Sequence, residues 1–145
     1  MKRIETSVVI DRPKDHIFAY VIEPSNIPEW APGYLEGVST SEGPIRVGST
    51  SRRVANFGVR ESESQHIVTE FEPNSHIAID TKTGPLEIRE SFDLEAADRG
   101  TRVTIAEEVS APLLLKPAEW IFALSAGRNI AKYGEALKEK LEESV

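Results

Sequence analysis

Two glutamates on neighbouring predicted strands are the first candidates for chemistry in this sequence. Residues 86–96 and 101–109 predict a β-hairpin, and antiparallel pairing outward from its turn places Glu90 opposite Glu107. Two carboxyls at such close range disfavour joint ionisation, which raises the pKa of one of them. A carboxyl with a raised pKa suits a general acid or base. Glu90 and Glu107 are therefore the candidates for a catalytic role.

The register of this hairpin is supported on both of its faces. Setting Ala96 opposite Thr101 brings apolar side chains together on the inner face and opposite charges together on the outer face. Each such cross-strand pair stabilises a sheet by about 0.2–1 kcal/mol. The pairs are Leu94 with Val103 and Phe92 with Ile105 on the inner face, and Glu95 with Arg102 and Arg89 with Glu108 on the outer face. The same register places both candidate glutamates on the inner face.

Residues 117–143 predict a long helix against which this sheet packs. Its second half is amphipathic, with Ile130, Leu137 and Leu141 on one face, whereas residues 120–127 are apolar nearly all round. A helix that is apolar all round must be covered on all sides. The apolar half therefore predicts a sheet that curves around the helix.

Arg128 lies near the join of the two halves, on the same helical line as Ile121 and Leu124. One interpretation is that Glu90, Glu107 and Arg128 form a polar spot in an otherwise apolar pocket. The alternative is a pair of carboxylates at a solvated end of the sheet, with Arg128 paired elsewhere or exposed. The residues alone leave both interpretations open.

Other kinds of site find little support in the sequence. The three histidines, His16, His66 and His76, are too scattered to form a metal-ligand set, and there is no cysteine. Residues 43–50 have the glycine spacing of a phosphate loop, but they lack its lysine and precede a strand. There is no Gly-x-Ser-x-Gly motif for a serine hydrolase of that type. We expect neither a metal nor another cofactor.

Length and charge narrow the class of protein. The 145 residues fit one domain, residues 1–145, and are enough for a sizeable core. The formal net charge of −7 argues against nucleic-acid binding, which needs a basic surface. No apolar run has the roughly 20 residues of a membrane span, and the N-terminus lacks the apolar run of a signal peptide. We therefore expect a cytoplasmic protein.

The rest of the chain predicts strands and short helices, so the expected fold class is α+β. A short helix follows Pro13 and ends before Pro24, and a second occupies residues 27–30. The other expected strands are residues 3–10, 35–41, 50–56, 59–71 and 77–81.

Three further strand pairings follow from the predicted turns. Thr81 is expected opposite Leu86, and a turn at Phe57-Gly58 sets Arg52 opposite Glu63. The third pairs Phe71 with His76, which brings Val68 beside Ile79. Glu63 and Gln65 then face inward only if the long strand carries a β-bulge.

Several stretches resemble a known superfamily over essentially the whole chain. They are the stretch Pro24-Ser25-Asn26-Ile27-Pro28-Glu29-Trp30-Ala31-Pro32, the strand start Val47-Gly48-Ser49-Thr50, the turn Phe71-Glu72-Pro73 and the hairpin segment Gly100-Thr101-Arg102-Val103-Thr104. Together with the order of elements, they resemble the polyketide cyclase/dehydrase-like branch of the START superfamily (SRPBCC type). The resemblance implies a helix-grip fold: a seven-stranded curved antiparallel sheet wrapped around a long C-terminal helix, with two short helices after the first strand. It also implies a cavity for an apolar small molecule, with Trp30 near it.

Three functions are compatible with these observations. The first is binding or carriage of a small apolar molecule, lipid-like or polyketide-like, between the sheet and the C-terminal helix. The second is a cyclase or dehydratase that uses a cavity carboxylate, Glu90 or Glu107, as its general acid or base. The third is a module that binds another protein, with a vestigial cavity and an exposed apolar patch. A homodimer is also compatible with the sequence. The expected ligand-binding residues are Trp30, Phe92, Ile105, Trp120, Ile121, Leu124 and Arg128.

Overall fold

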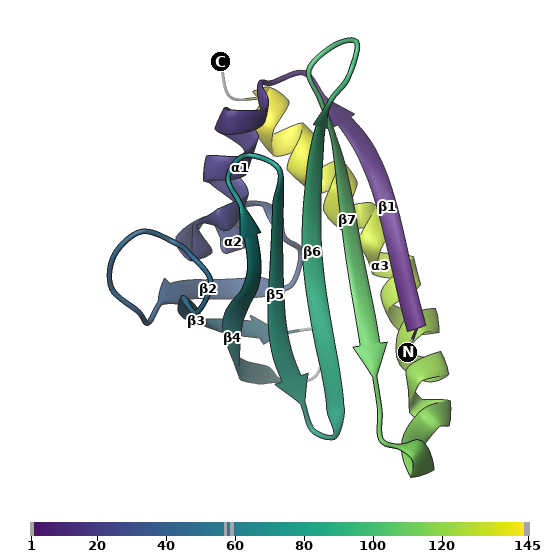
Figure 1. The fold of residues 1–145 in the computed structure, drawn as a ribbon. Coiled ribbons are helices and arrows are strands. Elements are labelled where there is room, and N and C mark those ends of the chain that lie inside the picture. The colour runs from purple at the N-terminus through teal and green to yellow at the C-terminus, as the bar shows by residue number, and fades with distance from the viewer. Residues whose placement is uncertain (1, 57, 59, 144–145) are drawn as a thin grey trace.

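A computed structural model of the protein describes residues 2–56, 58 and 60–143, without the side chains of residues 83 and 125–128. The chain alternates from strand to helix and back in the predicted order (Figure 1). Its elements are β1 (Lys2–Ile10), α1 (Lys14–Ile22), η1 (Pro24–Asn26), α2 (Ile27–Trp30), β2 (Tyr34–Ser39), β3 (Thr50–Asn56), β4 (Glu61–Glu72), β5 (His76–Thr83), β6 (Leu86–Ala96), β7 (Thr101–Ser110), η2 (Leu113–Leu115) and α3 (Lys116–Glu143).

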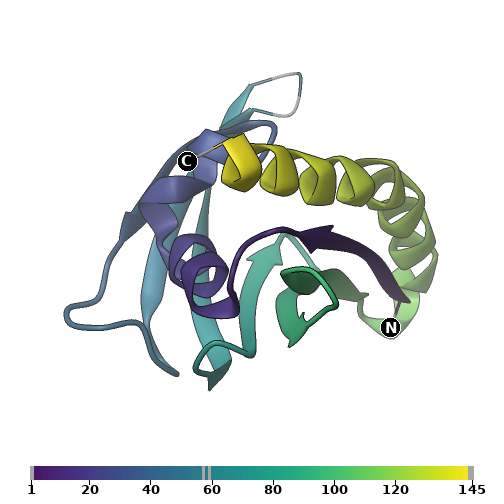
Figure 2. The ribbon, with the colours of Figure 1, turned by 90° about the horizontal axis from the view of Figure 1, so that it is seen from above.

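The strands form one antiparallel sheet in the order β1-β7-β6-β5-β4-β3-β2. The sheet curves, and α3 lies along its concave side, while α1 and α2 cover one end (Figure 2). This arrangement confirms the predicted helix-grip fold. Among the described residues, no helix has the length and apolar composition needed to cross a membrane.

The register of β6 and β7 is the predicted one, whereas that of β5 and β6 differs from the prediction. Ala96 pairs with Thr101, and Glu90 pairs with Glu107. Thr81 lies opposite Ile88 instead of Leu86. The reason is a shorter turn: the strands extend to Thr83 and Leu86, and Gly84, with a φ of +58°, begins a two-residue connection. A shift of two residues keeps each side chain on its predicted face.

The register of β3 and β4 also differs by two residues. Arg52 lies opposite Gln65, not Glu63, because Asn56 pairs with Glu61 and the connection spans residues 57–60. Phe57 and Val59, which the predicted turn and strand included, lie outside the described residues.

A β-bulge in β4 decides which side chains face the interior. Val68 pairs with Ile79 as predicted, but the pairing shifts between Val68 and Glu70, so Phe71 lies opposite Ile77 instead of His76. Because the bulge follows Val68, it leaves the face of the earlier residues unchanged. Glu63 and Gln65 therefore stay exposed on the outer face, and Ser64 and His66 turn inward, opposite β3 residues that include Arg53.

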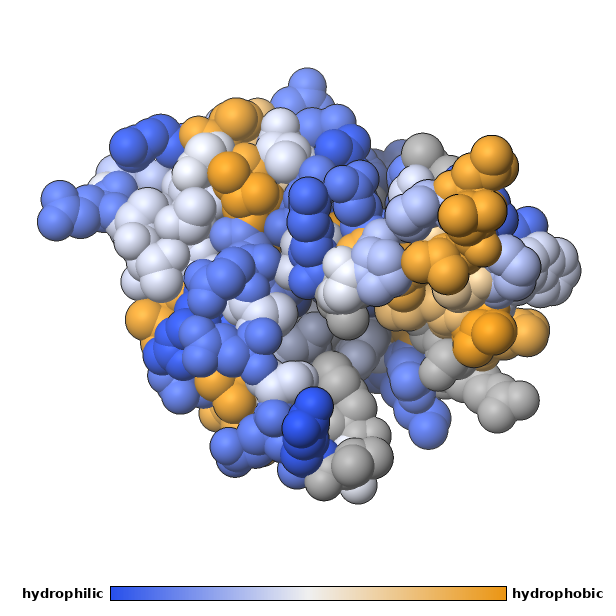
Figure 3. All heavy atoms as spheres, turned by 90° about the horizontal axis from the view of Figure 1, so that it is seen from below, coloured by the Kyte–Doolittle hydropathy of each residue, from blue (hydrophilic) through white to orange (hydrophobic). Residues whose placement is uncertain are grey.

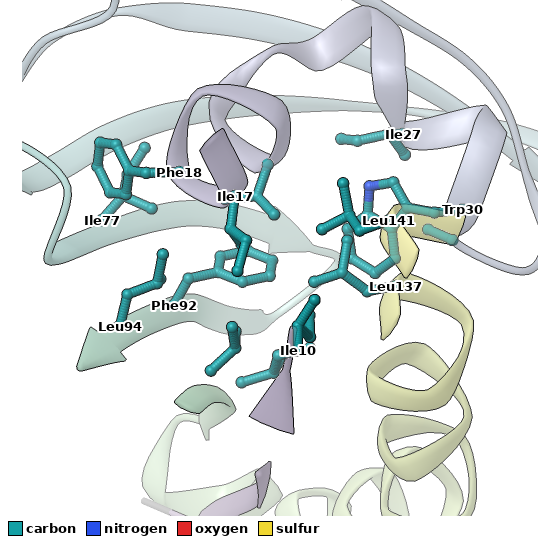
Figure 4. Packing of buried hydrophobic residues seen from close by; sticks show 14 of the residues in the cluster. Ile10, Ile17, Phe18, Ile27, Trp30, Ile77, Phe92, Leu94, Leu137 and Leu141 are labelled. Carbon is teal, nitrogen blue, oxygen red and sulfur yellow. The ribbon is translucent and has the colours of Figure 1, made fainter. Parts of the chain in front are cut away.

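The second half of α3 anchors the helix to the core, as predicted. Ile130, Leu137 and Leu141 are buried and pack in one cluster with Ile10 and Trp30 (Figure 4). The helix also comes close to β1 at Gly134, where a Cβ atom would lie 3.1 Å from Cγ1 of Val8. The amphipathic half of α3 therefore fixes the position of the helix on the sheet.

The first half of α3 does not fulfil the prediction that Trp120, Ile121 and Leu124 line a pocket. Their exposed fractions are 59%, 70% and 62%, respectively. The inner face of this half instead carries Glu119 and Phe122, one turn apart, while the line through Ile121 and Leu124 faces solvent. The exposed side chains of Ile121 and Leu124 form an apolar patch with those of the turn η2 (orange, at the right of Figure 3).

Candidate functional site

A cavity of about 350 Å³ lies between the concave face of the sheet and α3. Its volume falls within the range typical of small-molecule sites, about 300–1,000 Å³. Its walls mix aliphatic and aromatic side chains with a polar group at the middle of the sheet. The lining residues are Tyr34, Arg53, Ala55, Ser62, Ser64, His66, Ile79, Thr81, Ile88, Glu90, Glu107, Phe122, Asn129 and Tyr133.

An ion pair between β3 and β6 forms the base of the polar group. Nη2 of Arg53 donates to Oε1 of Glu90 over 3.1 Å, and only 4% of Arg53 is exposed. The guanidinium also lies over the ring of Tyr34, 5.5 Å from its centroid. Nε of Arg53 is buried and makes no hydrogen bond to a described residue. A buried cation held by a carboxylate and an aromatic ring is a fixed charge in the cavity wall.

Glu107 lies opposite Glu90 on the inner face and lines the same cavity. Burial, together with the negative charge of Glu90, raises the pKa of Glu107 to about 7, although the positive charge of Arg53 partly opposes both effects. This carboxyl therefore exchanges its proton near neutral pH. The predicted pairing of the two glutamates on the inner face is confirmed, and both line the cavity.

A histidine and a serine from β4 complete the polar wall. Oγ of Ser64 lies 2.7 Å from Nε2 of His66, and both residues line the cavity. Burial lowers the pKa of His66 to about 4, with a further contribution from the positive charge of Arg53. His66 is therefore a neutral imidazole at pH 7, and its bond to Ser64 is one between neutral groups.

Two tyrosines from different elements line the cavity with this polar group. Tyr34 comes from β2 and Tyr133 from α3, and burial raises the pKa of both phenols. Both therefore stay protonated at neutral pH. The ring of Tyr133 also packs edge-on against Trp30, with centroids 6.4 Å apart. Packing holds this phenol in place at the cavity.

Comparison with known proteins assigns the chain to a family. The model of the family described as polyketide cyclase/dehydrase and lipid transport matches residues 1–142. The chain belongs to this family. Comparison with curated protein sequences gave no match.

Solved structures of low sequence identity share the fold of this polyketide cyclase/dehydrase family member. The di-domain ARO/CYC BexL from the BE-7585A biosynthetic pathway superposes with a TM-score of 0.80 at 21% identity, over 98% of this chain and 47% of that one. This chain thus spans about half the length of that di-domain protein. The Zhui aromatase/cyclase from Streptomyces sp. R1128 gives 0.79 at 14% identity, over 98% of this chain and 94% of that one. A protein from Thermus thermophilus gives 0.78 at 13% identity, covering 99% of this chain and all of its own.

Of the ligand-binding residues predicted from the sequence, three lie beside the cavity of this family member instead of on its wall. Trp30, Phe92 and Ile105 are buried core residues around a small hollow that Arg53 and Glu90 also line. The exposed Trp120, Ile121 and Leu124 have been described above. The side chain of Arg128 lies outside the described residues.

The sequence prediction missed three residues of the polar wall: Arg53, His66 and Tyr133. Arg53 on β3 and His66 on β4 could not be assigned to the inner or the outer face of the sheet, because that assignment depended on the position of the bulge. The signal that could have found them is Val68: pairing with Ile79 makes the even positions of β4 inner, and His66 precedes Val68 by two.

A larger hollow of about 1030 Å³ is lined mainly by outer-face residues of β4 to β7. The carboxylates there already have partners, such as Asp80 with Arg89 at 2.7 Å and Glu87 with Lys82 at 3.6 Å. Within the described part of the chain, no three His, Asp or Glu residues are grouped as a metal site requires. The candidate site of this family member is therefore the inner cavity.

Proposed function

We propose that this protein binds a small, largely apolar molecule in the cavity between the sheet and α3. The observation that carries the proposal is the cavity itself: about 350 Å³, with the apolar side chains of Ile79, Ile88 and Phe122 on its walls beside the polar group described above. Apolar walls with a small number of placed polar groups are typical of small-molecule sites. The apolar walls exclude water from the body of the ligand, and the polar group orients one end of it.

The class of ligand that we propose is lipid-like or polyketide-like. The family description names polyketide cyclases, dehydrases and lipid transport, and two proteins of the same fold are named as aromatase/cyclases. These names support the proposal without naming a compound. The protein would act as a carrier if it releases the bound molecule without changing it chemically.

Filling the cavity tests this proposal. Ala55 is 5% exposed and lines the cavity, so Ala55→Phe places a ring in the ligand space. We expect native mass spectrometry of the purified wild-type protein to show a bound compound, and the Ala55→Phe variant to lose it. Ala19→Phe, at an exposed position on α1, is the matched control and should keep the compound. Equal occupancy in both variants would contradict a ligand in this cavity.

The second candidate is an enzyme of the cyclase or dehydratase type, favoured by one observation. Glu107 faces the cavity with a pKa raised to about 7 by burial and by Glu90. A general acid or base works best when its pKa lies near the operating pH. In this proposal Glu107 moves a proton at a carbon next to a carbonyl group, or at a departing hydroxyl.

The pH dependence of turnover distinguishes this candidate from simple binding. With a linear poly-β-ketone mimic as substrate, a general acid would lose activity as pH rises through 7, because Glu107 gives up its proton. A general base would lose activity as pH falls through 7. Glu107→Gln should abolish turnover and leave binding of the mimic intact. Turnover that is absent, or unchanged in Glu107→Gln, would exclude this role.

A further inference from the structure

Glu107 is the carboxyl of the cavity that has no partner among the described residues. Its neighbour Glu90 is held by Arg53 over 3.1 Å, whereas no described side chain donates a hydrogen bond to Glu107 or pairs with it. On the other side, β1 places the apolar residue Ile4 opposite it. A carboxylate in such a place is costly unless something pairs with it.

The charges that the described residues place around Glu107 sum to one unbalanced negative charge. Arg53 and Glu90 cancel each other, and His66 is neutral at pH 7 because burial and Arg53 lower its pKa to about 4. The phenols of Tyr34 and Tyr133 are also uncharged, since burial raises the pKa of both. Among the described side chains, the ionised form of Glu107 therefore has no positive charge left to balance it.

Besides the charge of Glu107, aromatic rings in the cavity wall favour a cation. Phe122 and Tyr133 from α3 line the cavity together with Glu107. The faces of aromatic rings attract cations, and in this cavity the guanidinium of Arg53 already lies over the ring of Tyr34. The formal charge of the chain, −7, also favours the approach of a cation over that of an anion.

We propose that the ligand of this cavity carries a protonated amine, which pairs with Glu107, on an apolar body that lies against Ile79, Ile88 and Phe122. This inference rests on the proposed function and adds the charge of the ligand to it. A ligand with a carboxylate would add a negative charge beside two glutamates that share one cation. A neutral ligand would leave Glu107 either protonated or unpaired.

The charge pairing gives binding a defined pH dependence. With a pKa of about 7, Glu107 is half protonated near pH 7, and a cation binds its ionised form. Binding of an amine should therefore weaken as pH falls below 7, because a proton must first leave Glu107. The groups that face Glu107 and also act on this equilibrium are Glu90, Arg53, Tyr34, Tyr133 and His66.

Three probes with one ring system test this inference in the full-length protein. They are 1-naphthylmethylamine, which stays protonated from pH 5.5 to 8, the neutral 1-naphthylmethanol and the anionic 1-naphthylacetate. By titration calorimetry at pH 8, we expect the amine to bind at least about tenfold more tightly than the alcohol, as a charge-assisted hydrogen bond allows. The preference should shrink toward pH 5.5, where Glu107 is protonated.

Variants assign the preference to one carboxyl. Glu107→Gln should remove the preference for the amine, and Glu107→Asp, which keeps the charge, should retain part of it. Glu63→Gln makes the same change of charge on the outer face and should alter nothing. Equal binding of amine and alcohol, or a preference that survives Glu107→Gln, overturns the cationic ligand and leaves the proposed function standing. No binding of any probe overturns both.

Discussion

At the scale of single residues, the site depends on one buried cation, the guanidinium of Arg53. Arg53 is 4% exposed and bonded to Glu90, and its charge also acts on Glu107 and His66. A buried ion pair contributes little net stability by itself, but removing one partner leaves an uncompensated charge in the interior. Removing Arg53 should therefore lower the stability of the protein by more than the intact ion pair contributes to it.

Replacing Arg53 by methionine should destabilise the protein by roughly 2–4 kcal/mol, since Glu90 is left without its cation. We expect a value near the lower end of this range, because the Glu90 side chain is 20% exposed and water can partly solvate its charge. Arg52→Met is the control: this neighbour pairs with Glu36 at an exposed site, where an ion pair is worth about 1 kcal/mol or less. Urea denaturation measures both. Equal effects of the two substitutions would mean that the Arg53–Glu90 pair is not buried.

At the scale of elements, the sequence predicted the type of nearly every element but not the positions where strand pairs shift. The register of β6 and β7 could be predicted because both faces of that hairpin constrain it, one by apolar pairs and the other by opposite charges. The turn between β5 and β6 offered no such check. Gly84 and Pro85 close it in two residues, whereas the sequence suggested four.

The bulge of β4 explains most of what the sequence prediction missed at the site. A bulge is a local event whose position no periodic pattern reveals, and here it lies after Val68. Placed earlier in the strand, it would have turned Glu63 inward. Its actual position, after Val68, leaves His66 on the inner face and, across the strand pair, Arg53 as well. Two residues of the polar wall therefore depend on a feature that the pairing of strands reveals.

The two halves of α3 illustrate a limit of composition as a guide. Residues 120–127 are apolar nearly all round, which predicted complete burial. In the structure Phe122 lines the cavity while Trp120 and Leu124 remain exposed, and the ammonium group of Lys2 lies over the ring of Trp120, 4.4 Å from its centroid. The apolar composition of this half therefore did not reveal which of its side chains are buried within this chain.

At the scale of the whole molecule, the curved sheet and α3 bring residues from β2, β3, β4, β6, β7 and α3 to one cavity. The order of elements and the family resemblance predicted this architecture, which belongs to many sequences of low identity. The polar wall of the cavity, in contrast, is formed by individual side chains, which the fold alone does not specify. The function that we propose follows from that wall, so its test must reach the carboxyl at its centre.

The most direct test is the pKa of Glu107, measured by NMR of its carboxyl carbon in the free protein and with 1-naphthylmethylamine bound. An unpaired, buried carboxyl beside Glu90 should titrate near pH 7 in the free protein. A bound amine should lower that pKa, because a cation favours the ionised form. A pKa at the ordinary value of 4.5 that does not change with the probe would contradict a ligand site centred on this carboxyl.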